Sequence, residues 1–130
     1  MKRVYPAVFT PDGDWYVVYV PDFDITTQGE GLADAIDMAR DAINLMGVTI
    51  EDEGKTIPDA SHIDSVDVPD GGFVSLVDCD FDEYRRFLEN RAVKKNCTLP
   101  SWLNKKAEAA NVNFSQVLQE ALIEKLGLKD

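Results

Sequence analysis

The sequence predicts an α+β fold in which a β-β-β-α-β module with a short helix precedes a C-terminal strand-helix-helix module. Three observations support it: strand-like runs rich in β-branched and aromatic residues, one amphipathic helix among them, and a charge split. Residues 1–90 carry 6 basic and 20 acidic side chains, a net charge of -14, whereas residues 91–130 carry 7 and 4, a net charge of +3. We therefore expect two domains, 1–90 and 91–130, with partners of opposite charge.

Composition excludes several classes of protein. With 130 residues the chain is too short for a large multidomain enzyme, and no apolar run approaches the roughly 20 residues that a membrane helix needs. Its first residues lack the apolar core of a secretory signal, so we expect a cytoplasmic protein without a membrane partner. Cys79 and Cys97 are isolated, which excludes a paired-cysteine metal site and predicts two small buried hydrophobic residues.

The first two strands are predicted over residues 4–9 and 15–20, joined by the turn sequence TPDGD into a β-hairpin. Pro6 lacks an N–H group, so the first strand is either at a sheet edge at that point or begins after it. A weaker third strand is expected over residues 25–28. Trp15, Tyr16 and Tyr19 alternate imperfectly, which favours packing in the sheet over an exposed patch, although an exposed one among them could anchor a partner.

One amphipathic helix follows, beginning near Glu30 and ending at Gly47, a residue typical of helix C-caps. Residues 48–71 indicate a loop with at most short structure near 63–68. A strand over 73–77 and a short helix capped by Asp80 or Asp82 complete a two-layer sandwich of one sheet and one packed helix.

The C-terminal module begins with a predicted strand, 93–99, which Pro100 ends by starting a helix. After a turn, Asn113 is the expected N-cap of a second helix that Gly127 closes. The lone strand has no partner within its module. It must therefore pair with a copy of itself, which predicts a homodimer or homotetramer.

A two-stranded antiparallel ribbon fits the major groove of DNA. Alternation turns Cys97 and Leu99 toward the helices and leaves Lys94, Asn96 and Thr98 on the opposite face, where they would be suitable base readers. The second helix begins at Asn113 to Ser115, and its free N–H groups would bind a phosphate. The simpler interpretation is that these polar residues only solvate a dimerisation strand.

The residues VKKNCTLPSWLNKKAEAANVNFSQVLQEALIEKLGL closely resemble the C-terminal ribbon-helix-helix module of HicB-type antitoxins. The runs YPAVF, WYVVYVPDF and TQGEGLADAIDMARDAI are similar to the partial RNase H-like domain of that family. The resemblance implies a bacterial or phage-borne antitoxin without catalytic activity. It would block a HicA toxin, a small basic mRNA-cleaving protein, and repress its own operon through operator DNA.

On that interpretation the acidic domain covers the toxin. We expect the toxin-contacting residues within the acidic segments, at Asp22, Phe23, Asp24 and Glu30.

Two alternatives remain. A metal-dependent RNase H-like nuclease would use Asp78, Asp80 and Asp82, but its fold needs an acid on the first strand, and none is present. An orphan DNA-binding regulator would sense another ligand through its N-terminal domain. His62 is expected on the surface, and we expect neither a metal nor a cofactor.

Overall fold

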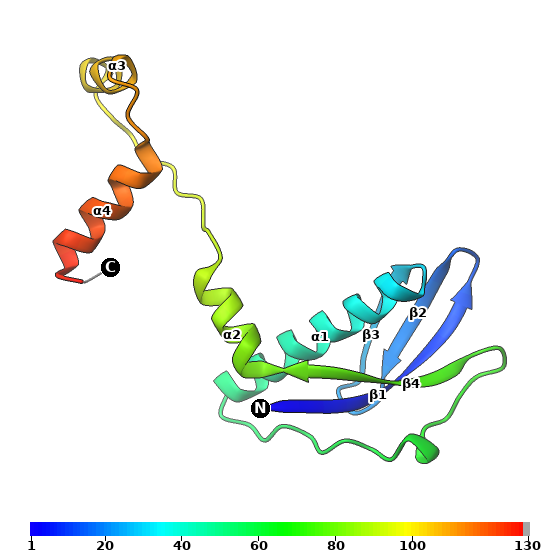
Figure 1. The fold of residues 1–130 in the computed structure, drawn as a ribbon. Helices are drawn as coiled ribbons and strands as arrows, with labels where there is room; N and C mark the ends of the chain where they lie inside the picture. The colour runs from blue at the N-terminus through cyan, green and yellow to red at the C-terminus, as the bar shows by residue number, and fades with distance from the viewer. Residues whose placement is uncertain (129–130) are drawn as a thin grey trace. The chain divides into compact units, whose positions relative to one another are not determined.

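The computed structural model describes residues 1–128, and these divide into two compact units, unit 1 over 1–92 and unit 2 from Val93 onward. The fold is mixed α+β, as predicted, with a four-stranded antiparallel sheet and four α-helices (Figure 1). The elements are β1 (Lys2–Asp12), β2 (Trp15–Val20), β3 (Ile25–Glu30), α1 (Leu32–Asp52), β4 (Phe73–Asp80), α2 (Phe81–Asn90), α3 (Ser101–Ala109) and α4 (Phe114–Leu126). Within residues 1–128, no helix is long and apolar enough to cross a bilayer.

The strands of unit 1 lie in the order β3-β2-β1-β4. β1 begins at Lys2, so the expectation that it might start after Pro6 is wrong. Pro6 lies opposite Leu76 of β4, while the pairing with β2 starts only at Val8. The missing N–H of Pro6 therefore falls where β1 has a single neighbouring strand, in agreement with an edge position at that point.

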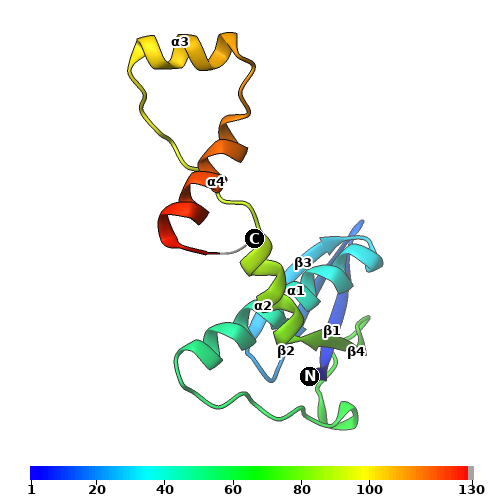
Figure 2. The same cartoon turned by 60° about the vertical axis from the view of Figure 1, so that its left-hand side comes forward.

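One face of the sheet carries the core. Tyr5, Phe9, Val18 and Val77 are almost fully buried in one cluster with α1, which crosses the strands on that side (Figure 2). The loop between α1 and β4 adds to this layer, because the Tyr5 hydroxyl donates to the carbonyl oxygen of Pro58 at 2.7 Å. A short 3-10 turn, Ile63–Ser65, lies inside the loop, where the sequence suggested short structure.

α1 does not end at Gly47 as expected, but continues to Asp52. Gly47 is buried inside the helix, and a Cβ atom at this position would overlap the ring of Phe81. Gly47 thus serves the close approach of a side chain and does not terminate the helix. Phe81 begins α2 directly after β4, so this contact fixes the junction of β4 and α2 against α1.

The helix ends elsewhere follow the sequence signals. Asp80 caps α2 by accepting a hydrogen bond from the N–H of Glu83, and Asn113 caps α4 in the same way through Gln116, each at 3.1 Å. Gly127 ends α4 in the left-handed conformation, with φ of 68°. These caps satisfy backbone groups that the first and last helical turns leave free.

Candidate functional site

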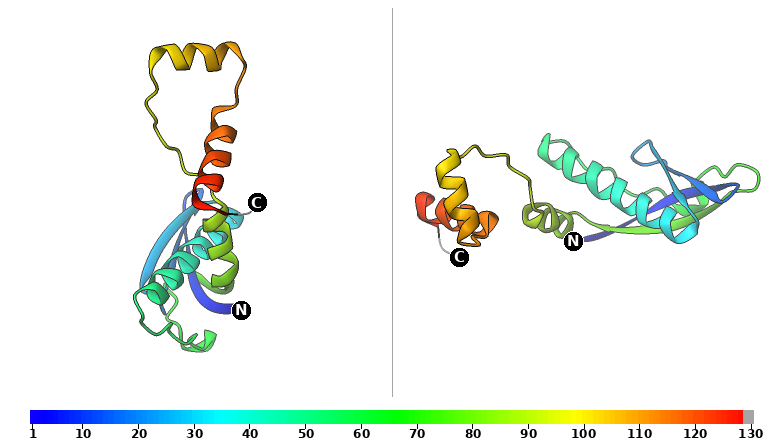
Figure 3. Two further views of the ribbon diagram at one scale, coloured as in Figure 1. Left: turned by 90° about the vertical axis from the view of Figure 1, so that its left-hand side faces the viewer. Right: turned by 90° about the horizontal axis from the view of Figure 1, so that it is seen from above.

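Residues 92–100 form no strand in the single chain, so the predicted strand over 93–99 is absent from this structure. The segment is extended, as Figure 3 shows for the stretch before α3, and every residue in it is exposed. A strand is defined by its pairing, and the described part of the chain offers this segment no partner.

Alternation along the segment nevertheless follows the expected pattern. Cys97 and Leu99 line a cavity of about 490 Å³ together with Phe114, Val117 and Leu118 of unit 2. Cys97 is exposed at this cavity, so the expectation that both cysteines are buried is wrong for Cys97 and right for Cys79. We call this cavity the unit 2 groove.

The predicted base readers Lys94, Asn96 and Thr98 are exposed and do not line the unit 2 groove. Of the two residues predicted to bind a phosphate, Asn113 uses its side chain to cap α4, and Ser115 lines the groove.

Unit 2 has no interior of its own. Between Val93 and Leu128 no residue is buried. Val112 and Ile123 are half-buried, and the other large apolar side chains are exposed: Val93, Leu99, Trp102, Leu103, Phe114, Val117, Leu118, Leu122, Leu126 and Leu128. Such a surface is far more apolar than that of an ordinary monomeric domain. This surface resembles one half of a hydrophobic core that is divided between two subunits.

The acidic segments of unit 1 are used in different ways. Asp22 accepts hydrogen bonds from the N–H and hydroxyl of Ser61 and so anchors the loop, while Phe23 is buried edge-to-face against Tyr5. Asp24 and Glu30 are exposed, and Asp24 accepts a hydrogen bond from the Tyr19 hydroxyl at 2.9 Å. Only these last two place free carboxylate surface toward solvent.

The second face of the sheet carries no helix. Register and alternation give this open sheet face the apolar residues Val4, Pro6, Val8, Trp15, Val17, Tyr19, Val74 and Leu76. Trp15, Tyr19 and Leu76 are 42%, 38% and 55% exposed. The aromatic residues thus divide, because Tyr16 packs against the core while Trp15 and Tyr19 form an exposed patch. Sequence reasoning missed this patch, although apolar residues at both alternating positions of β1 and β2 signalled it.

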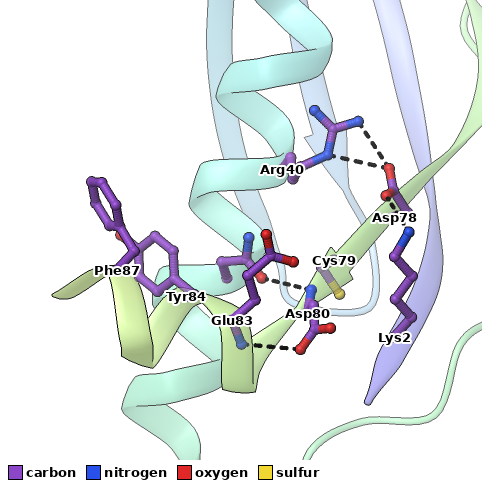
Figure 4. A pocket seen from close by; sticks show the side chains of 9 residues that line it. Lys2, Arg40, Asp78, Cys79, Asp80, Glu83, Tyr84 and Phe87 are labelled. Carbon is purple, nitrogen blue, oxygen red and sulfur yellow. Dashed lines mark hydrogen bonds and ion pairs between the residues drawn. The ribbon is translucent and has the colours of Figure 1, made fainter. Parts of the chain in front are cut away.

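The carboxylates of the nuclease alternative are engaged in structural contacts, which Figure 4 shows for Asp78 and Asp80. Asp78 accepts hydrogen bonds from Arg40 at 2.8 and 3.2 Å, Asp80 caps α2, and Asp82 pairs with the amino group of Met1 at 2.7 Å. Within residues 1–128 no three His, Cys, Asp or Glu side chains are grouped so that they could hold a metal ion.

These contacts also determine the electrostatics of the cavity drawn in Figure 4, which has a volume of about 490 Å³. Hydrogen bonds from Arg40 lower the pKa of Asp78, and the N–H of Glu83 lowers the pKa of Asp80. Both carboxylates are therefore held ionised, whereas a general acid requires a raised pKa. Burial raises the pKa of the Cys79 thiol in the same wall to about 11.

Comparison with known proteins gives one family. Residues 5–122 match the model of the HicB-like antitoxin of bacterial toxin–antitoxin systems. A chain of a toxin–antitoxin complex from Streptococcus pneumoniae is 29% identical with a TM-score of 0.60, covering 96% of this chain and 99% of that one. The antitoxin HicB of Burkholderia pseudomallei is 26% identical with a TM-score of 0.52, covering 98% and 97%. No curated protein matches the sequence.

Proposed function

Because the chain belongs to the HicB-like antitoxin family, we propose that it neutralises a HicA-type toxin, a small basic mRNA-cleaving protein, and represses its own operon through operator DNA. The single observation that carries this proposal is the contrast between an acidic, self-contained unit 1 and a basic unit 2 without a core. Each unit has the surface that one of the two activities requires.

Toxin neutralisation is assigned to unit 1. An enzyme that cleaves RNA must hold a polyanion and therefore presents basic side chains, which the acidic unit attracts. Binding there would compete with RNA for the same cations. The structural similarity to a chain of a toxin–antitoxin complex supports a toxin as the partner.

Dimerisation is assigned to unit 2. Two copies of residues 93–99 would pair as an antiparallel ribbon, which supplies the backbone partners that the single chain lacks. The paired ribbon and α4 helices would then cover the unit 2 groove and bury the apolar side chains of both copies. Such a dimer would have a ribbon-helix-helix arrangement. We assign unit 1 of the same chain a partial RNase H-like fold. A tetramer would arise from two such dimers.

DNA binding is assigned to the outer face of that ribbon. Lys94, Asn96 and Thr98 would contact base edges, and the N–H groups at Asn113 to Ser115 would hold a phosphate. Two observations support this assignment. The three side chains are exposed, and the residues that alternate with them, Lys95 and Cys97, line the unit 2 groove.

We assign the chain no catalytic role. The acidic run Asp78, Asp80 and Asp82 already serves an ion pair, a helix cap and the N-terminal amino group. These contacts give the run a structural purpose.

The test is co-expression with the product of a small basic reading frame sought beside this gene. We expect that protein to arrest growth alone, to be rescued by this chain, and to co-purify with it. Growth arrest without rescue would overturn the toxin assignment.

A separate test addresses DNA. Lys94→Ala should weaken operator binding and reduce its salt dependence, while Asn96→Ala should weaken binding to the operator about 10-fold and leave random DNA unchanged. Lys105→Ala is the matched control, since Lys105 is an exposed lysine of α3. Equal losses for Asn96→Ala on operator and random DNA would contradict base readout.

A further inference from the structure

We infer that the open sheet face is the surface of unit 1 that docks the toxin, with Trp15, Tyr19 and Leu76 as its centre and acidic residues as its rim. This inference rests on the proposed function and adds the location of contact. The proposed contact is thereby narrowed from the whole acidic surface of unit 1 to the open face of its sheet.

The centre of the face has the composition of a binding surface. Trp15 and Tyr19 lie on the same face of β2, and Leu76 lies across β1 on β4, with Pro6 and Val8 between them on β1. Pro6 and Val8 are buried between these neighbours, although they lie on the face opposite to the core cluster that packs against α1. Large exposed aromatic residues around a flat apolar floor are the usual anchors of protein interfaces.

The rim identifies the charge of the occupant. Trp15 lies opposite Asp12 on β1 and opposite Glu30 on β3. Asp24 accepts a hydrogen bond from the hydroxyl of Tyr19. Asp12, Asp14, Asp24 and Glu30 are exposed, and none forms an ion pair with a described cationic side chain. The carboxylates of Asp12, Asp24 and Glu30 beside this patch repel nucleic acid and a second copy of the same face, and attract a basic protein.

The other face of the sheet is already occupied. α1 covers it, and the loop after α1 is fixed over it by two contacts, Ser61 on Asp22 and Tyr5 on Pro58. Asp22 and Phe23 therefore support unit 1 from within, whereas Asp24 and Glu30 border the open sheet face. The four acidic-segment residues named from the sequence thus have two different roles.

The first experiment places a positive charge at the centre. Leu76→Arg in the full chain should weaken its complex with the purified small basic protein at least about 30-fold, the scale of an interface hot spot. Leu45→Arg is the matched control, because Leu45 is 52% exposed on α1. Trp15→Ala, which adds no charge, should also weaken the complex about 10-fold or more, and circular dichroism checks the fold of each variant.

The second experiment tests the rim. Asp24→Asn with Glu30→Gln should slow association and reduce its dependence on salt, whereas Asp64→Asn with Asp67→Asn, two exposed loop acids, should change neither.

The outcomes separate the two proposals. If the original chain binds and Leu76→Arg and Trp15→Ala bind equally well, the open sheet face is not the docking surface and the antitoxin function stands. Loss of binding in Leu45→Arg instead would move the contact to α1. If the original chain does not bind the small basic protein, both proposals fail.

Discussion

The two units of this chain differ in where their apolar side chains find contacts. Unit 1 closes a core with its own residues, among them Phe9, Val18 and Ile43, all fully buried. Unit 2 forms two helices, of which α4 has a side-chain N-cap and α3 has none, but it buries no residue between Val93 and Leu128. Helix formation is thus a local property that both units share, while a core is a property of packing that unit 2 does not achieve in the single chain.

The largest expected effect tests the shared core. Leu118→Asp places a carboxylate in the unit 2 groove, where burial without a partner costs several kcal/mol per copy. We expect the self-association constant to fall at least about 1000-fold, as measured by sedimentation at several concentrations. Gln119→Asp, at an exposed position of α4 outside the groove, should associate normally. Association that survives Leu118→Asp would place the interface elsewhere.

The next effect belongs to the self-contained core. Phe9→Ala removes a fully buried ring that stacks on Phe73 with centroids 5.4 Å apart, and should lower the free energy of unfolding of unit 1 by about 3–5 kcal/mol. Urea unfolding followed by the fluorescence of Trp15 measures it, in a Trp102→Phe background that removes the second tryptophan. The midpoint should not depend on protein concentration. A concentration-dependent midpoint would mean that unit 1 also needs a partner.

The caps allow a like-for-like comparison of the units. Asp80→Ala and Asn113→Ala each remove a side-chain acceptor at an N-cap, a loss of about 1 kcal/mol per helix. In a paired unit 2 the loss occurs twice per assembly, so Asn113→Ala should weaken self-association while Asp80→Ala should not. Thermal unfolding at two concentrations distinguishes them, and equal concentration dependence would contradict the comparison.

The smallest effect is the pH dependence of unit 1. Because Arg40 lowers the pKa of Asp78 in the folded state, the pair stabilises the fold above the ordinary pKa of an aspartate. That contribution is lost as the pH falls through the lowered pKa. Both side chains are partly exposed, so Asp78→Asn should cost less than about 1 kcal/mol at pH 7 and less again at pH 2. Urea unfolding across this pH range measures the difference, and a variant equally destabilised at both pH values would exclude the ion pair as the cause.

The sequence predicted what depends on local pattern. The order of strands and helices, the caps at Asp80 and Asn113 and the closing Gly127 all follow from signals within a few residues. The prediction failed for features that depend on distant residues, such as the ring of Phe81 against Gly47 or the bond from Ser61 to Asp22. The strand over 93–99 fails for the same reason, because a strand needs a pairing partner and residues 1–128 of the single chain offer it none.

Of the candidate sites, the unit 2 groove could be predicted from alternation, because the segment 93–99 has apolar residues at one set of alternating positions only. The open sheet face was not, since β1 is apolar at both sets, and only the packing of α1 decides which set remains uncovered. Asp24 and Glu30 were named for their charge, and their place beside Trp15 and Tyr19 comes from the strand register.

The glycine under Phe81 has a consequence for protein engineering. Replacing a glycine inside a helix by alanine is a standard way to raise thermal stability, and α1 offers Gly47 as its one such position. Here the added methyl group would displace the ring of Phe81, and the loss of packing energy would exceed the gain in helix propensity. A stabilised variant must therefore be sought on the exposed side of α1, for example at Thr49. Its hydroxyl donates its hydrogen bond to the carbonyl oxygen of Leu45 within the same helix.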